Sequence, residues 1–171
     1  MPIKLTTLIP GFIVALLTLM AAAPWGLEAS GRFLLPLLPF LAIAHFTALQ
    51  PNSMPGGLVF GSGLCLDVLT HGPLGYWSFV FLAGYLLMQW LAVTPPPSLL
   101  QRWLAFAVVM ACVVAVEWSI SSLFFIQPAD WRPLLSAGLG AIALFPVAAL
   151  ALQPLHKIGA LAGRLNLERG G

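Results

Sequence analysis

Long apolar runs, separated by short polar or proline-bearing segments, dominate the pattern of this 171-residue chain. A helix that crosses a hydrocarbon core of about 30 Å needs about 20 apolar residues, and runs of roughly that length fill most of the chain. The pattern predicts spanning helices over residues 5–24, 33–50, 57–71, 73–94, 102–126 and 133–153. We therefore expect an all-α membrane protein, a six-transmembrane-helix bundle in which residues 1–171 form a single transmembrane domain with short loops.

Two of these runs allow another interpretation. Residues 5–24 follow Lys4 and contain Ala21-Ala22-Ala23, which fits a secretory signal peptide, but Pro24 directly after the potential cleavage site favours a retained helix. Residues 57–71 would form a helix of only about 22 Å. They fit a short span, a span that begins at Pro55, or a re-entrant segment.

Composition and charge agree with a bilayer environment. Hydrophobic residues make up 60% of the chain and charged residues 7%, which excludes a water-soluble domain of this size. The net charge of +2 is too small and too scattered for a nucleic-acid surface. With six spans and a cytoplasmic N-terminus, five basic residues lie inside (Lys4, Arg102, Lys157, Arg164 and Arg169) and two lie outside (Arg32 and Arg132).

The charge count fixes one part of the topology and leaves another open. If residues 57–71 do not span and the N-terminus is outside, five basic residues again lie inside and two lie outside. Residues 154–171 are therefore predicted as a cytoplasmic basic tail in either arrangement. We choose six spans because Lys4 stands at the start of the first helix.

Small residues recur at helical spacing in the third run. Gly57, Gly61 and Cys65 repeat every four residues on one face. A second face carries Gly56, Gly63 and Asp67, which fall within about 40° of one another for 3.6 residues per turn. Such faces serve either tight packing within the bundle or docking of another protein's helix.

Two carboxylates are predicted at membrane depth, Asp67 and Glu117. Asp67 stands four residues before His71, so the pair is expected to meet, either as a structural clamp at the Gly72 break or as a proton-relay or ligand site. Glu117 is predicted to be buried and hydrogen-bonded to Tyr85, His45 or both, because counting along the helices places the three at similar depth. Structural and transport roles both remain open for Glu117.

Signals for enzymatic chemistry are weak. Gly61-Ser62-Gly63 lacks the spacing of a serine nucleophile elbow, and the unequal depths expected for Asp67 and Glu117 speak against a shared-proton pair. No cluster of His, Cys and carboxylate has metal-ligand spacing in the sequence. We therefore expect no enzymatic activity, no metal and no cofactor.

The run FGSGLCLDVLTHGPLGYWSFVFLAGYL resembles the MreD family of rod-shape-determining membrane proteins. That family's core is a glycine-bearing helix ending in aspartate, a short break, leucine-glycine, and an apolar helix closing with tyrosine-leucine. The matching positions are Gly61, Gly63, Asp67, Gly72, Pro73, Leu74, Gly75, Tyr85 and Leu86. The match covers under a fifth of the chain, and the turn at residues 50–57 departs from the family by lacking a basic residue.

The resemblance implies a non-enzymatic scaffold of the bacterial cell-elongation machinery in the cytoplasmic membrane. Such a scaffold binds the single-span MreC and connects an actin-like filament to a peptidoglycan glycosyltransferase and transpeptidase pair. The MreD fold is also similar to the vitamin-binding subunits of energy-coupling-factor transporters, and a small-molecule binding subunit is the alternative function. We expect structural or partner-docking roles for Gly57, Gly61, Gly63, Asp67, His71, Gly72, Pro73, Gly75, Tyr85 and Glu117.

Overall fold

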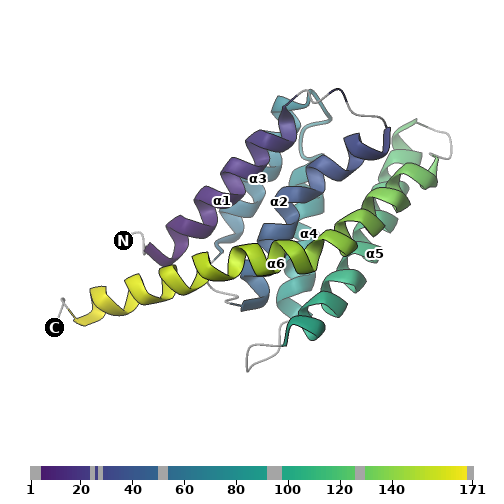
Figure 1. The fold of residues 1–171 in the computed structure, drawn as a ribbon. Coiled ribbons are helices and arrows are strands. Elements are labelled where there is room, and N and C mark those ends of the chain that lie inside the picture. Colours follow the sequence, from purple (N-terminus) through teal and green to yellow (C-terminus); the bar gives the residue numbers. More distant parts are fainter. Residues whose placement is uncertain are drawn as a thin grey trace.

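The computed structural model describes the backbone of residues 5–23, 26, 29–49, 54–91, 98–125 and 130–168. Side chains are described within residues 9–23, 33–49, 54–91, 98–123 and 130–154 and at Gly26. Six α-helices and no strand occur in these ranges (Figure 1). Their bounds are α1 Leu5–Ala22, α2 Ala29–Leu49, α3 Gly56–Leu69, α4 Tyr76–Leu91, α5 Leu99–Phe125 and α6 Trp131–Glu168.

Helix α2 is the centre of the bundle. It contacts each of the other five helices, which pack in the order α1, α3, α4, α5, α6 and back to α1 around it (Figure 1). Every residue from Pro39 to Ala48 is buried, without a polar stripe turned outward. A helix that is apolar on all sides is stable only when neighbours cover it completely, and this arrangement supplies that cover.

Stacked aromatic rings fill the space around α2. Phe40 of α2 lies 6.0 Å from Phe81 of α4 and 6.0 Å from Phe106 of α5, measured between ring centroids. Phe106 stacks on Phe145 of α6 at 4.4 Å, and Trp77 continues the series beyond Phe81 at 5.8 Å. The four phenyl rings are fully buried, so α2, α4, α5 and α6 are joined by one aromatic column.

The helix number agrees with the sequence prediction, while several boundaries differ. Helix α4 begins at Tyr76, so Pro73 is not its first residue as the sequence suggested. Helix α6 continues through Pro154 to Glu168, where the sequence predicted a separate tail from residue 154. A proline removes one backbone donor but does not force the chain out of helical geometry, so α6 passes through it.

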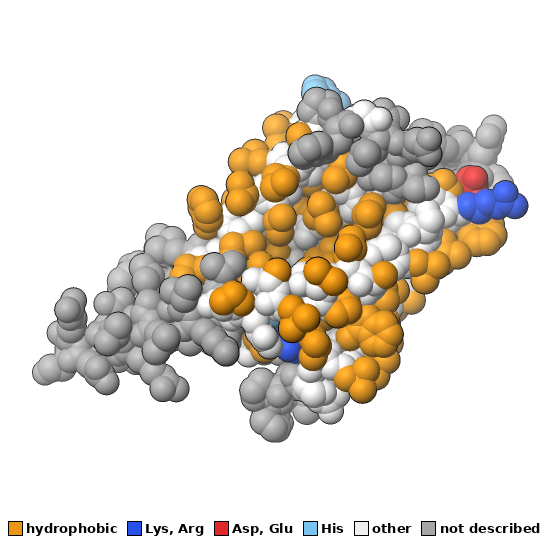
Figure 2. Space-filling view, viewed as in Figure 1, with side chains coloured by type: hydrophobic (Ala, Val, Ile, Leu, Met, Phe, Trp, Pro, Cys, Tyr) orange, Lys and Arg blue, Asp and Glu red, His pale blue; other side chains and the backbone are white. Residues whose placement is uncertain are grey.

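The exterior is largely apolar. Large hydrophobic side chains are exposed on α1, α3, α4, α5 and α6, and they cover most of the described surface in Figure 2. By length and composition, two stretches of the described residues suffice to cross a membrane, Leu99–Leu123 and Trp131–Pro154. The apolar parts of the other four helices are shorter than 18 residues. The all-helical architecture is thus confirmed, whereas six spans are not.

Candidate functional site

The carboxylate of Asp67 joins the end of α3 to the beginning of α4. One oxygen, Oδ1, accepts a hydrogen bond from the Trp77 backbone N–H at 2.9 Å. The other, Oδ2, accepts one from the Gly75 N–H at 2.8 Å and lies 3.4 Å from the Ser78 hydroxyl. Asp67 is fully buried, so these bonds replace the water that a carboxylate otherwise needs.

Asp67 acts as the N-terminal cap of α4, although it belongs to another helix. The Phe79 N–H bonds to the Gly75 carbonyl at 2.9 Å, which places Gly75 at the capping position. Gly75 has no side chain to accept the exposed N–H groups, and its φ of +93° favours glycine. The carboxylate of Asp67 takes over that function and also meets the positive end of the α4 dipole.

Close backbone contact between α3 and α4 brings Asp67 into range. A Cβ atom added to Gly63 would lie 2.5 Å from both Cα and N of Ser78, so only glycine fits there. The Ser78 hydroxyl also reaches the Phe60 carbonyl at 3.2 Å. The predicted tight packing of the face with Gly63 and Asp67 is therefore confirmed.

Tyr85 of α4 forms a hydrogen bond at the opposite end of the α3 and α4 pair. Its hydroxyl donates to the Met54 carbonyl at 2.6 Å, two residues before α3 begins, and accepts from the Gln89 amide at 2.6 Å. Polar bonds thus fix both ends of the α3 and α4 pair, with the Gly63 contact between them. Four of the residues that carry the family resemblance, Gly63, Asp67, Gly75 and Tyr85, lie in this one interface.

The predicted contact between Asp67 and His71 is wrong. Helix α3 ends at Leu69, so His71 lies outside the helix, exposed and with a left-handed φ of 55°. The Gly72 N–H bonds to the Asp67 carbonyl and the His71 N–H to the Val68 carbonyl, which is the Schellman arrangement. The break predicted at residues 71–72 is real, and it is made by the backbone.

The predicted partners of Glu117 are also wrong. Glu117 is buried as expected, but Tyr85 donates to Met54, and no hydrogen bond joins Glu117 to either ring nitrogen of His45. Glu117 instead lies near Tyr76, the first residue of α4, and its Oε1 has no hydrogen-bond partner. The prediction placed Glu117 level with Tyr85 by counting residues from the helix ends. Helix α4 begins at Tyr76 and not at residue 73, and Glu117 of α5 lies near its first residue, Tyr76.

The second small-residue face of α3 is open. Gly57 and Gly61 have nothing within 4 Å of an added Cβ, and Cys65 is exposed. Phe60 and Leu64 stand exposed beside them. We call Gly57, Phe60, Gly61, Leu64 and Cys65 the open face of α3; no other described part of the chain packs against its glycines.

The sequence reasoning did not single out Gly84. An added Cβ would lie 2.4 Å from the Phe40 ring, so this glycine makes room for the aromatic column. The available signal was a glycine in the middle of a long apolar run rich in aromatic residues.

Comparison with protein-family profiles, with curated proteins and with solved structures finds no match for the chain. Within the described residues, no group of three or more His, Cys, Asp and Glu side chains is placed to hold a metal ion. The local geometry around Asp67 is that of a structural lock, because every oxygen of its carboxylate is engaged by α4.

Proposed function

We propose that this protein is a non-enzymatic membrane scaffold of the bacterial cell-elongation machinery. In this role it binds an MreC-like single-span membrane protein and helps couple an actin-like filament to a peptidoglycan glycosyltransferase and transpeptidase pair. The proposal rests on the resemblance of residues 60–86 to the MreD family and on the way those residues are used.

The observation that carries the proposal is the set of hydrogen bonds that the Asp67 carboxylate accepts from Gly75, Trp77 and Ser78, which we call the Asp67 lock. Asp67 and Gly75 are both positions of the resemblance, and a hydrogen bond of 2.8 Å links them. A carboxylate whose two oxygens already accept backbone N–H groups is poorly suited to bind a substrate or carry protons. A motif built for holding two helices together supports a scaffold better than a transporter.

The filled interior supports the same choice. A small-molecule binding subunit needs a cavity with converging polar groups. In this bundle α2 and the rings of Phe40, Phe81, Phe106 and Phe145 occupy the centre. Two grooves are lined by apolar side chains and cysteine, one between α4 and α5 and the other between α2 and α6 with Leu17.

We further propose that all six helices lie in the cytoplasmic membrane, with both termini in the cytoplasm. The apolar exterior is the kind of surface that a bilayer covers. Asp67 and Arg132 then lie toward the outside and Arg102 toward the cytoplasm, in keeping with the distribution of basic residues.

The open face of α3 is the surface proposed for the partner's helix. Gly57 and Gly61 allow a neighbouring backbone to approach closely, and their side of α3 is left uncovered by the rest of the bundle. Phe60 and Leu64 flank the two glycines and supply apolar contact area.

Affinity capture from detergent-solubilised membranes tests the function. We expect the tagged protein to retain an MreC-like single-span protein. Replacing Gly61 with leucine should reduce that capture by about tenfold or more, because loss of close backbone contact removes most of the packing energy of such helix pairs.

The matched control is Ala111→Leu, a small-to-large change on an exposed position of α5. It should leave capture unchanged. Recovery of a transporter ATPase module in place of the single-span protein would contradict the scaffold and favour the binding subunit. Equal capture by the two variants would refute the open face as the docking surface while leaving the scaffold role intact.

A further inference from the structure

Arg102 is a buried cation for which the described residues provide no acidic partner. It lies in the first turn of α5, only 4% of its surface is exposed, and its Nε and Nη1 atoms have no hydrogen-bond partner. A buried charge is tolerated when it is paired or hydrogen-bonded. The guanidinium therefore has two donors free for an anion that the described residues do not supply.

The acidic side chains of the described residues lie too far from Arg102 to form an ion pair with it. Glu117 lies fifteen residues further along α5, which is about 22 Å along the helix axis. Asp67 is near the end of α3 and Asp130 directly precedes α6. Both belong to the opposite end of the bundle from the start of α5 (Figure 1).

The start of α5 adds to the positive potential around Arg102. Ser98 and Gln101 form a capping box, in which the Gln101 side chain accepts from the Ser98 N–H at 2.8 Å and the Ser98 hydroxyl accepts from the Gln101 N–H at 3.3 Å. The helix that begins there is 27 residues long and directs its positive dipole end toward this site. Helical side chains lean toward the N-terminus, so the guanidinium lies over this first turn.

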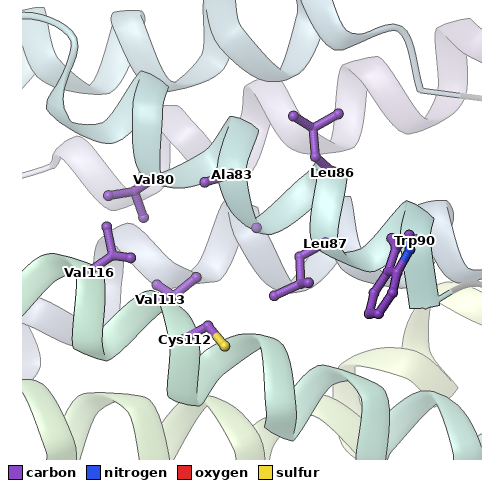
Figure 3. A pocket seen from close by; sticks show the side chains of 9 residues that line it. Val80, Ala83, Leu86, Leu87, Trp90, Cys112, Val113 and Val116 are labelled. Atoms are coloured by element: carbon purple, nitrogen blue, oxygen red, sulfur yellow. The ribbon is translucent and has the colours of Figure 1, made fainter.

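An apolar groove continues from this end of the bundle. It lies between α4 and α5, has a volume of about 390 Å³, and is lined by Val80, Ala83, Gly84, Leu86, Leu87, Trp90, Cys112, Val113 and Val116 (Figure 3). Val113 and Val116 stand 11 and 14 residues after Arg102, which puts them within about 40° of it around the helix. From Trp90 to Val80 the groove follows α4 for ten residues, or about 15 Å.

We propose that Arg102 binds the phosphate of an anionic phospholipid whose acyl chain lies in the α4–α5 groove. The phosphate supplies the missing negative charge and oxygen acceptors that the planar guanidinium can bind in pairs. One leaflet of the hydrocarbon core is about 15 Å deep, which matches the groove length. The exposed indole of Trp90 lines the groove near the end of α4, and tryptophan commonly meets the interfacial region of a lipid. This site requires only a membrane location and is independent of the scaffold partner.

Quenching of tryptophan fluorescence tests the proposal on the purified full chain in detergent. The probes are phosphatidylglycerol and phosphatidylcholine with identical brominated acyl chains, and inorganic phosphate as a competitor. We expect phosphatidylglycerol to quench at a concentration about tenfold lower than phosphatidylcholine, because the choline ammonium of phosphatidylcholine offsets the charge of its phosphate and phosphatidylglycerol carries no such cation. Trp90→Phe should remove most of the quenching, because Trp90 is the tryptophan that lines the groove.

Variants at two arginines identify the charge that is responsible. Arg102→Gln should abolish the preference for phosphatidylglycerol, and Arg102→Lys should retain most of it. The control is Arg132→Gln, since Arg132 also stands in the first turn of a helix but is exposed. It should behave like the natural protein.

Three results would overturn the lipid site. They are equal quenching of the unaltered protein by the two lipids, an unchanged preference in Arg102→Gln, and full displacement of phosphatidylglycerol by millimolar inorganic phosphate. The last result would indicate a free-anion site. The first and third are measured on the natural chain, so the test does not depend on the folding of a variant.

Discussion

The indole Nε1 of Trp103 donates a hydrogen bond of 2.9 Å to the backbone carbonyl of Ile142 in α6. That carbonyl would ordinarily accept from the residue four positions later, but that residue is Pro146, which has no N–H. A side chain of α5 thus replaces a backbone donor of α6. The bond joins the two longest helices of the bundle at a point where α6 is weakest.

A double-mutant cycle on this contact has a defined expected result. Trp103→Phe should lower the free energy of unfolding by about 1–3 kcal/mol, because the Ile142 carbonyl is left without a donor. In a Pro146→Ala background the backbone supplies the donor, so the same change should cost about 1 kcal/mol less. Denaturant titration in mixed micelles measures both values. Identical costs in the two backgrounds would show that the indole acts by packing alone.

The Asp67 lock predicts a large effect from a small change. Asp67→Asn keeps one acceptor but turns an amide group toward a backbone N–H, so the free energy of unfolding should fall by about 2 kcal/mol. Asp130→Asn is the control, because Asp130 is exposed and accepts a hydrogen bond from the nearby Arg132 N–H. It should change stability by less than about 0.5 kcal/mol. Similar stability of the two variants would contradict the lock.

Two glycines of α3 should respond in opposite ways to the same substitution. Gly63→Ala places a methyl group against the Ser78 backbone and should destabilise the isolated protein by about 1–3 kcal/mol. Gly61→Ala meets nothing within 4 Å and should be neutral or stabilising by up to about 1 kcal/mol, because alanine favours the helix. Thermal melts of the two purified variants make the comparison. A lower melting temperature for Gly61→Ala than for the natural protein would mean that other parts of the bundle pack against the open face of α3.

Glu117 differs from Asp67 in having an unsatisfied oxygen. Glu117→Gln keeps the shape and replaces a buried ionisable carboxyl group with a neutral amide, so the free energy of unfolding should rise by up to about 1 kcal/mol. The same denaturant titration detects this. A fall of more than about 1 kcal/mol would show that the carboxyl group makes a stabilising contact that the amide cannot replace.

Local features of the fold could be read from the sequence. The apolar runs predicted all six helices, the residues at 71–72 predicted the break, and glycine spacing predicted the close contact at Gly63. These succeed because helix periodicity and backbone conformation are local properties. The two faces of α3 could be recognised as well, but not which one the chain itself would cover.

Partners across the bundle could not be read in the same way. Asp67 was expected to bind His71, four residues away, yet its partners start eight residues away at Gly75. Glu117 was assigned partners by depth, which depends on where each helix begins and on the packing register. The central place of α2 had a visible signal, the absence of a polar stripe from Pro39 to Ala48, but its neighbours depend on how all five other helices close around it.

The bond between Asp67 and α4 also bears on biosynthesis, if the helices enter a bilayer as proposed. Helices α3 and α4 contain 14 and 16 residues, so each is shorter than the roughly 20 needed for an independent crossing. The ribosome synthesises Asp67 before Gly75 and Trp77, whose backbone N–H groups bond to its carboxylate. We expect the insertion machinery to hold α3 until α4 arrives and to release the two as one hairpin. A nascent chain stopped after Leu69 should remain accessible to protease, whereas one that extends past Leu91 should be protected.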